Sequence, residues 1–266
     1  MLFDDGVVEA LVGALPTWAA ALLLVVAFLG SVYVVGPLTA IAYLANDRLS
    51  WWPPVVLVGY GTFVAMKPVV SIPRPSAEAP LAREALPPVL TPLYDFGIGF
   101  SNAGFPSGHA VAVTILWGLF VVDGPVGTVR QRLVAAIAAI SAVGISRVGL
   151  GLHYPGDVVG GILIGMVVLT IGLFVRFKCR DPVPVLLGMA ALLAAASILV
   201  GREFEGLLLV GAVVAFGSVE LGRRLWATCR ITFDHSMVPS DQPRPLNTND
   251  SDINSVGTSH TTVDND

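Results

Sequence analysis

The chain alternates between long apolar stretches and short polar links. Seven stretches are nearly free of charged residues, and a helix needs roughly 20 such residues to cross a bilayer. Several stretches are shorter, but flanking Lys and Arg side chains can reach the interface and Trp51 and Trp52 can anchor there. The stretches are Pro16–Leu44, Pro53–Met66, Phe105–Val122, Leu133–Ile145, Tyr154–Val175, Val183–Val200 and Gly206–Val219. The pattern predicts an all-α, polytopic transmembrane helix bundle with six to seven spans.

Two segments interrupt this pattern. The Pro-rich connection Pro73–Gly104 is too long for a simple loop, and we expect a short helix in it at the membrane surface. From Ile231 onward the sequence is rich in Asp, Asn, Ser, Thr and Pro, so it cannot bury enough apolar surface to fold. We therefore expect a membrane domain over residues 1–230 and a disordered acidic tail over residues 231–266.

Composition supports membrane insertion and gives no indication of a disulfide framework or a metal site. The chain is 55% hydrophobic and 13% charged, whereas soluble domains are about a quarter charged. The N-terminus, "MLFDDGVVEA", lacks the basic region of a cleaved signal peptide, so we expect the first apolar stretch to be retained. Cys179 and Cys229 are too far apart in sequence to indicate a disulfide framework or a metal site.

Basic residues are distributed unevenly between alternate links, which predicts the orientation of the chain. One side carries five: Lys67, Arg74, Arg83, Arg147 and Arg202. The other side carries nine: Arg48, Arg130, Arg132, Arg176, Lys178, Arg180, Arg223, Arg224 and Arg230. The positive-inside rule places the nine in the cytoplasm. We therefore expect a multi-pass cell-membrane protein whose N-terminus is extracytoplasmic and whose tail is cytoplasmic.

Three polar motifs fall on the predicted extracytoplasmic side. The first is "KPVVSIPRP", the second is "PSGH", and the third is "SRVGLGLHYPGD". Lys67, Arg74 and Arg147 bring three cations to a membrane edge, where they are costly unless an anion lies among them. A phosphate suits this set, because Arg offers bidentate donors, Lys a point charge, and a helix start at Ser107 and Gly108 further donors.

Two histidines complete the predicted site. His153 and Asp157 are four residues apart at a helix start, so the carboxylate can hold one ring nitrogen and leave the other free to attack. His109, from a different helix, is suited to protonate a leaving oxygen. Taken singly, these residues have simpler explanations, such as interfacial cations, a satisfied polar residue and a helix-capping pair. Together on one face they indicate phosphoryl transfer through a phosphohistidine.

The order K-x6-R-P, P-S-G-H, S-R-x5-H-x3-D resembles the type 2 phosphatidic acid phosphatase superfamily. The resemblance covers roughly Lys67–Asp157 and implies a helical core, usually with six spans. It implies phosphate binding by Lys67, Arg74 and Arg147, helped by Ser107 and Gly108. It also implies that His109 is the general acid, that His153 is the nucleophile and that Asp157 orients it. No metal and no other cofactor are implied.

The leading functional hypothesis is an extracytoplasmic membrane phosphatase that acts on a phosphatidic-acid-type lipid or a polyprenyl pyrophosphate. The expected partners are this substrate and membrane lipids, with no nucleic acid; the oligomeric state is not predicted. A lipid phosphotransferase is the alternative, because a phosphohistidine can pass its phosphoryl group to an alcohol. A transporter is disfavoured because we find no internal repeat and the charges gather at one end. The haloperoxidase branch is disfavoured because its members are soluble.

Overall fold

The computed structural model describes residues 2–77, 80, 86, 88–89, 91–98 and 103–236. These residues are helical or irregular, with no strand in the described part of the chain. Residues 1–220 form one compact unit, and residues 221–266 form a second that is treated separately. The elements are α1 (Asp5–Gly13), α2 (Thr17–Phe28), α3 (Val32–Ala45), the 3₁₀ turn η1 (Asp47–Leu49), α4 (Trp52–Val70), α5 (Thr91–Ile98), α6 (Gly108–Asp123), α7 (Val129–Gly149), α8 (Pro155–Lys178), α9 (Pro182–Leu199) and α10 (Glu203–Ser236).

The predicted bundle of membrane helices is confirmed. Six helical segments are long and apolar enough to cross a bilayer, and α6 is a shorter apolar helix of 16 residues. The first apolar stretch is divided into α2 and α3 by a break after Phe28. At this break Gly30 lies so close to α6 that an added Cβ would be 3.3 Å from the carbonyl oxygen of His109. The short helix expected in the Pro-rich connection is α5.

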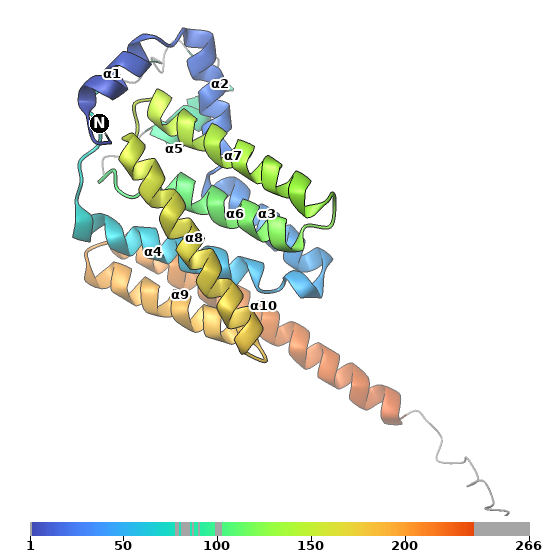
Figure 1. Cartoon of the computed structure of the whole chain (residues 1–266). Coiled ribbons are helices and arrows are strands. Elements are labelled where there is room, and N and C mark those ends of the chain that lie inside the picture. Colours follow the sequence, from blue (N-terminus) through green and yellow to red (C-terminus); the bar gives the residue numbers. More distant parts are fainter. Residues whose placement is uncertain are drawn as a thin grey trace, which may run out of the picture. The chain divides into compact units, whose positions relative to one another are not determined.

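Helix α4 is the centre of the compact unit. It packs against α3, α6, α8 and α9, as Figure 1 also shows. Val55, Ile115 and Val168, from α4, α6 and α8, are at most 4% exposed and belong to one apolar core. The core therefore holds together the helices that carry the first, second and third motifs.

Small residues allow α8 to pack closely on α6. A Cβ at Gly161 would lie 2.6 Å from the carbonyl oxygen of Ser107, and one at Gly165 would lie 2.8 Å from Cβ of Thr114. Such glycine-lined contacts are typical of membrane helices, where close backbone approach provides much of the attraction. As a result, the beginning of α6 is held directly against the first turns of α8.

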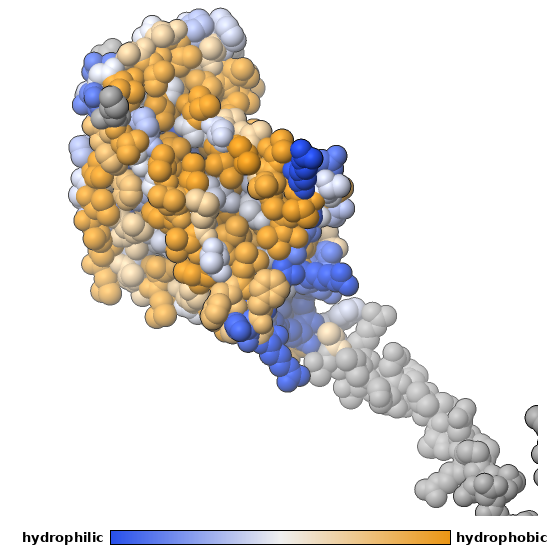
Figure 2. All heavy atoms as spheres, in the orientation of Figure 1, coloured by the Kyte–Doolittle hydropathy of each residue, from blue (hydrophilic) through white to orange (hydrophobic). Residues whose placement is uncertain are grey.

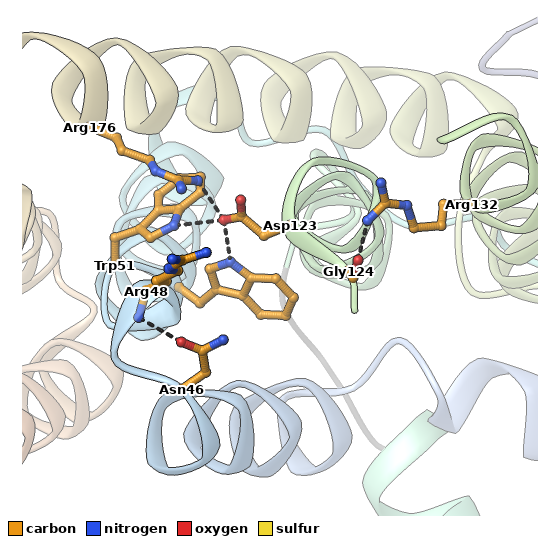
Figure 3. Close-up of polar contacts among 8 residues, drawn as sticks. Asn46, Arg48, Trp51, Asp123, Gly124, Arg132 and Arg176 are labelled. Atoms are coloured by element: carbon orange, nitrogen blue, oxygen red, sulfur yellow. Dashed lines mark hydrogen bonds and ion pairs between the residues drawn. The ribbon is translucent and has the colours of Figure 1, made fainter. Parts of the chain in front are cut away.

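The opposite ends of α4, α6 and α8 are joined by a polar cluster (Figure 3). Asp123 Oδ2 accepts hydrogen bonds from Nε1 of Trp51 at 3.0 Å and of Trp52 at 3.3 Å. Arg176 contacts the same oxygen at 2.5 Å, and its guanidinium lies 4.8 Å from the centre of the Trp51 ring. One carboxylate therefore links the three helices at the end away from the motifs.

The outer surface of the bundle is strongly apolar. Figure 2 shows hydrophobic side chains over most of one face, across α7, α8 and α9. Large side chains such as Leu163, Phe174 and Leu192 are more than half exposed. Soluble proteins seldom expose so much contiguous apolar surface, whereas a bilayer solvates it.

The second unit begins within α10. Residues 221–236 are the last turns of α10. The helix therefore includes residues 231–236, the first six residues of the segment that was expected to be disordered. The expectation for residues 237–266, like His260 within them, lies outside the described residues.

Candidate active site

The first motif places its two cations at the end of α4 and just beyond it. Lys67 lies in the last turn, is 6% exposed, and donates from Nζ to the carbonyl oxygen of Ala103 at 3.0 Å. Arg74 lies in the irregular segment that follows and donates from one terminal nitrogen to the carbonyl oxygen of Leu152 at 2.8 Å. These two hydrogen bonds attach the first motif to the segments that precede His109 and His153.

The second motif forms the beginning of α6. Ser107 is the N-cap residue and is fully buried, and its hydroxyl has no hydrogen-bond partner among the described residues. A Cβ at Gly108 would lie 2.9 Å from the ring of Phe63, so only glycine fits there without a shift. His109 follows in the first turn. A buried hydroxyl and a helix N-terminus form a binding site for an anion.

The third motif is a tight connection between α7 and α8. The carbonyl oxygen of Arg147 accepts hydrogen bonds from the backbone N–H groups of Leu152 at 3.1 Å and His153 at 3.2 Å. Gly151 has a φ of +71°, which glycine adopts without strain. The connection brings the end of α7, where Arg147 is 1% exposed, close to the beginning of α8.

His153 and Asp157 are in direct contact. Nδ1 of His153 lies 3.2 Å from Oδ2 of Asp157, and the backbone N–H of Tyr154 donates to the same oxygen at 2.9 Å. Both side chains are at most 2% exposed. In addition, the backbone N–H of Ser107 donates to the carbonyl oxygen of Asp157 at 3.0 Å, which attaches the second motif to the third.

The electrostatic environment favours a neutral His153. Burial lowers its pKa well below the usual value, and the positive charges of Arg147, Arg74 and Lys67 lower it further. In the neutral ring the contact with Asp157 assigns the proton to Nδ1, which leaves the lone pair of Nε2 available. Burial also lowers the pKa of Arg74, although the charge of Asp157 opposes this change.

All eight residues named from the sequence lie at one end of the bundle, where α4 and α7 end, where α6 and α8 begin, and in the segments that follow or precede them. Hydrogen bonds link the three motifs to one another, and the four positively chargeable side chains of Lys67, Arg74, His109 and Arg147 all act on His153. The arrangement can bind a phosphoryl group and present a nucleophilic nitrogen to it. The described residues contain no group of three or more His, Cys, Asp or Glu that could hold a metal ion.

Sequence analysis missed two side chains beside this site, Asp5 and Tyr154. The phenol of Tyr154 donates to Oδ1 of Asp5 at 2.9 Å. Tyr154 lies inside the third motif, but its position between His153 and Asp157 gave no indication of a role. Asp5 lies 149 residues away and was counted only as part of an acidic N-terminus, so no pattern in the sequence pairs the two.

Comparison with known proteins agrees with this geometry. Residues 51–181, which include all three motifs, match the sequence profile of the PAP2 superfamily. This segment therefore resembles the PAP2 superfamily over 131 of the 266 residues of the chain. The PAP2 segment covers α4 to α8, whereas α1 to α3, α9 and α10 lie outside it.

Two lipid A 1-phosphatases, from Rhizobium etli and Rhizobium johnstonii, resemble part of the chain. Each is 41% identical over 61 residues, which is 23% of this chain and 24% and 23% of those proteins. The chain thus aligns with about a quarter of the length of these relatives.

The fold also resembles a solved structure. A crystal structure of a transmembrane PAP2-type phosphatidylglycerolphosphate phosphatase from Bacillus subtilis matches with a TM-score of 0.53. The match covers 67% of this chain and 86% of that chain, at 22% identity. The likeness concerns the arrangement of the helices.

Proposed function

We propose that the protein is a membrane phosphatase that hydrolyses a lipid phosphate or pyrophosphate through a phosphohistidine. The observation that carries this proposal is the buried His153, held by Asp157 on one ring nitrogen and surrounded by three cations from the first and third motifs. The relatives named as lipid A 1-phosphatases and the PAP2 match support the same class of reaction.

The proposed reaction has two displacements at phosphorus. In the first, Nε2 of His153 attacks, the bond from phosphorus to the lipid oxygen breaks, and His109 protonates that oxygen. In the second, water attacks phosphorus, the bond from phosphorus to Nε2 of His153 breaks, His109 accepts a proton from the water, and inorganic phosphate leaves. Lys67, Arg74 and Arg147 stabilise the charge on the phosphoryl oxygens in both transition states. Ser107 and the N–H of Gly108 provide further donors.

An apolar groove supports a substrate with a hydrocarbon chain. The groove has a volume of about 520 Å³ and lies between α4, α8 and α9, with Met66, Leu163 and Leu192 among its lining residues. Met66 directly precedes Lys67, so the groove begins next to the cationic cluster. A lipid whose phosphate is bound by Lys67 can therefore place its chain along the groove. The substrate panel to test consists of phosphatidic-acid-type lipids, polyprenyl pyrophosphates and lipid A, which is named in the two relatives.

The test is phosphate release by purified protein in detergent. We expect release from at least one lipid of the panel, at the same rate in EDTA, and a loss of about 10³-fold or more in His153→Ala. Ser197→Ala, a buried hydroxyl change in α9, is the control for handling and folding. Undiminished phosphate release by His153→Ala would disprove the nucleophile assignment. Loss of phosphate release by the wild type in EDTA would disprove metal independence.

The same assay distinguishes hydrolysis from transfer. In the presence of an excess of a lipid alcohol, a phosphatase yields inorganic phosphate in amounts equal to the dephosphorylated lipid. A phosphotransferase instead yields a phosphorylated alcohol and little inorganic phosphate. Product analysis by thin-layer chromatography decides between the two.

A further inference from the structure

The N-terminal segment, residues 2–13, contacts all three motif segments at the candidate active site. The carbonyl oxygen of Leu2 accepts a hydrogen bond from the N–H of Gly156 at 2.9 Å. The ring of Phe3 lies 5.8 Å from that of Tyr154 and 6.4 Å from that of Phe105, measured between centroids. Gly156 and Tyr154 belong to the third motif, and Phe105 precedes the second.

Asp5 joins the first motif to the third through a single oxygen. Its Oδ1 accepts the phenol of Tyr154 at 2.9 Å and the backbone N–H of Ser76 at 3.0 Å. Tyr154 directly follows His153, and Ser76 comes two residues after Arg74. The bond between Arg74 and Leu152 spans the same gap, so these two connections set the distance between the arginine and the nucleophile.

The protonation states of this pair keep the contact in place near neutral pH. The hydrogen bonds from Ser76 and Tyr154 lower the pKa of Asp5, which therefore remains an ionised acceptor. Burial and the neighbouring Asp5 raise the pKa of Tyr154 to about 12, which keeps the phenol a donor. Hydrogen bonds to an ionised acceptor are shorter and stronger than neutral ones.

Val8 adds an apolar contact to the same assembly. It is fully buried in a cluster with Ala110 of α6, Val148 of α7, and Tyr154 and Val158 of α8. Ala110 directly follows His109, and Val148 directly follows Arg147. The residues that directly follow His109, Arg147 and His153 therefore share one apolar cluster with Val8 of α1.

We propose that Asp5 is a positioning residue for phosphoryl transfer, which holds Arg74 and His153 at their working distance although it lies outside the PAP2 segment. This role rests on the proposed phosphatase function. Asp5 does not contact the reacting atoms and acts through Ser76 and Tyr154. A displacement of about 1 Å between a nucleophile and the groups that hold its target reduces catalysis by roughly 10²-fold.

The experiment compares Asp5→Ala with Asp5→Asn. The alanine removes the acceptor, whereas the asparagine keeps an oxygen that can accept both hydrogen bonds. We expect kcat to fall about 10- to 100-fold in Asp5→Ala with KM changed less than about threefold, because lipid binding is retained while alignment is lost. In Asp5→Asn we expect kcat within about threefold of the wild type. Glu9→Ala, which removes an exposed carboxylate of α1, is the matched control and should keep full activity.

A second variant tests the path through Tyr154. Tyr154→Phe removes the phenol donor and should lower kcat in the same direction as Asp5→Ala. The double variant should be no slower than Asp5→Ala, within about threefold, because Asp5→Ala already removes the hydrogen bond that Tyr154→Phe removes. Independent, multiplying losses would contradict the proposed path. If Asp5→Ala fails to fold, as judged by gel filtration and its thermal midpoint, Tyr154→Phe and Asp5→Asn carry the test.

Binding of inorganic orthovanadate, which accepts a histidine nitrogen as a fifth ligand and so mimics the transition state of phosphoryl transfer, separates this proposal from the function on which it rests. We expect vanadate affinity to fall about tenfold or more in Asp5→Ala and to be retained in Asp5→Asn. If the wild type binds vanadate but turns over no lipid, the proposed function fails while the positioning role is still measured. Equal kcat and equal vanadate affinity in Asp5→Ala and the wild type would overturn the positioning role.

Discussion

The imidazole of His153 is kept neutral by the same surroundings that favour its reaction. Burial removes the hydration that a charged ring needs, and three nearby cations repel the added proton. The negative charge of a phosphate group among those cations reverses this balance only when substrate is bound. The proposed nucleophile is therefore neutral, with its attacking lone pair available, in the substrate-free protein.

We predict that His153 does not titrate in the usual histidine range. In NMR spectra of protein with ¹³C-labelled histidine, its signal, identified by its loss in His153→Gln, should remain that of a neutral ring down to about pH 6.5 and below. A synthetic peptide of residues 151–157 should titrate near 6.5, the ordinary value. A midpoint at or above this value in the folded protein would contradict the prediction.

The same pKa shift makes the stability of the fold depend on pH. Between the lowered pKa of folded His153 and its ordinary value of about 6.5 in the unfolded chain, only the unfolded chain binds the proton. The contribution of this residue to the free energy of unfolding is therefore complete above about pH 6.5 and decreases as the pH falls below it. Substitution by Gln should flatten this part of the stability profile.

At the scale of elements, the contact between α6 and α8 controls the position of the second motif. Gly161 faces the carbonyl oxygen of Ser107, which is backbone and cannot rotate away. A side chain at this position must push α6 from α8 and with it the Ser107 and His109 side chains. The helix interface thus contributes to the chemistry without supplying a functional group.

We predict that Gly161→Ala lowers kcat about tenfold or more through this displacement. Gly211→Ala in α10 is the matched control, since an added Cβ there meets nothing within 4 Å. The control should retain activity and gain up to about 1 kcal/mol of helix stability, because alanine favours helix more than glycine. Equal activity of both variants would show that α6 tolerates the shift.

At the scale of the whole molecule, the two ends of the bundle differ in charge and function. The candidate active site, α1 and Arg202 lie at one end, whereas Asp123, Arg176 and Arg48 lie at the other. This separation agrees with the side assigned to each of these residues by the count of basic residues. Which end faces the cytoplasm stays a prediction from that count.

We predict that impermeant maleimide labels a cysteine at the active-site end in intact cells. The design replaces Cys179 and Cys229 by alanine and then introduces Glu9→Cys in α1 or Val126→Cys between α6 and α7, both at exposed positions. Glu9→Cys should be labelled directly, and Val126→Cys only after the membrane is permeabilised. The reverse pattern would invert the topology.

Sequence analysis reached the parts of this molecule that depend on local pattern. The apolar stretches identified the helices, and the motif residues Lys67 to Asp157 were found because their types and spacings are restricted by phosphate chemistry. The connection between Asp5 and Tyr154, the link from Asp123 to Trp51, and the break at Gly30 each depend on segments that meet only in the folded chain. None of these contacts leaves a periodic or spaced pattern along the sequence.

The carboxylate of Asp123 has a mechanical consequence for substrate entry. It fixes α4, α6 and α8 to one another at one end, so these helices can separate only by pivoting about that point. Asp157 lies 19 residues before Arg176 on α8, a lever of about 28 Å, so a tilt of about 5° moves the active-site end by roughly 2.5 Å. A small rotation at this pivot therefore corresponds to a larger displacement at the candidate active site.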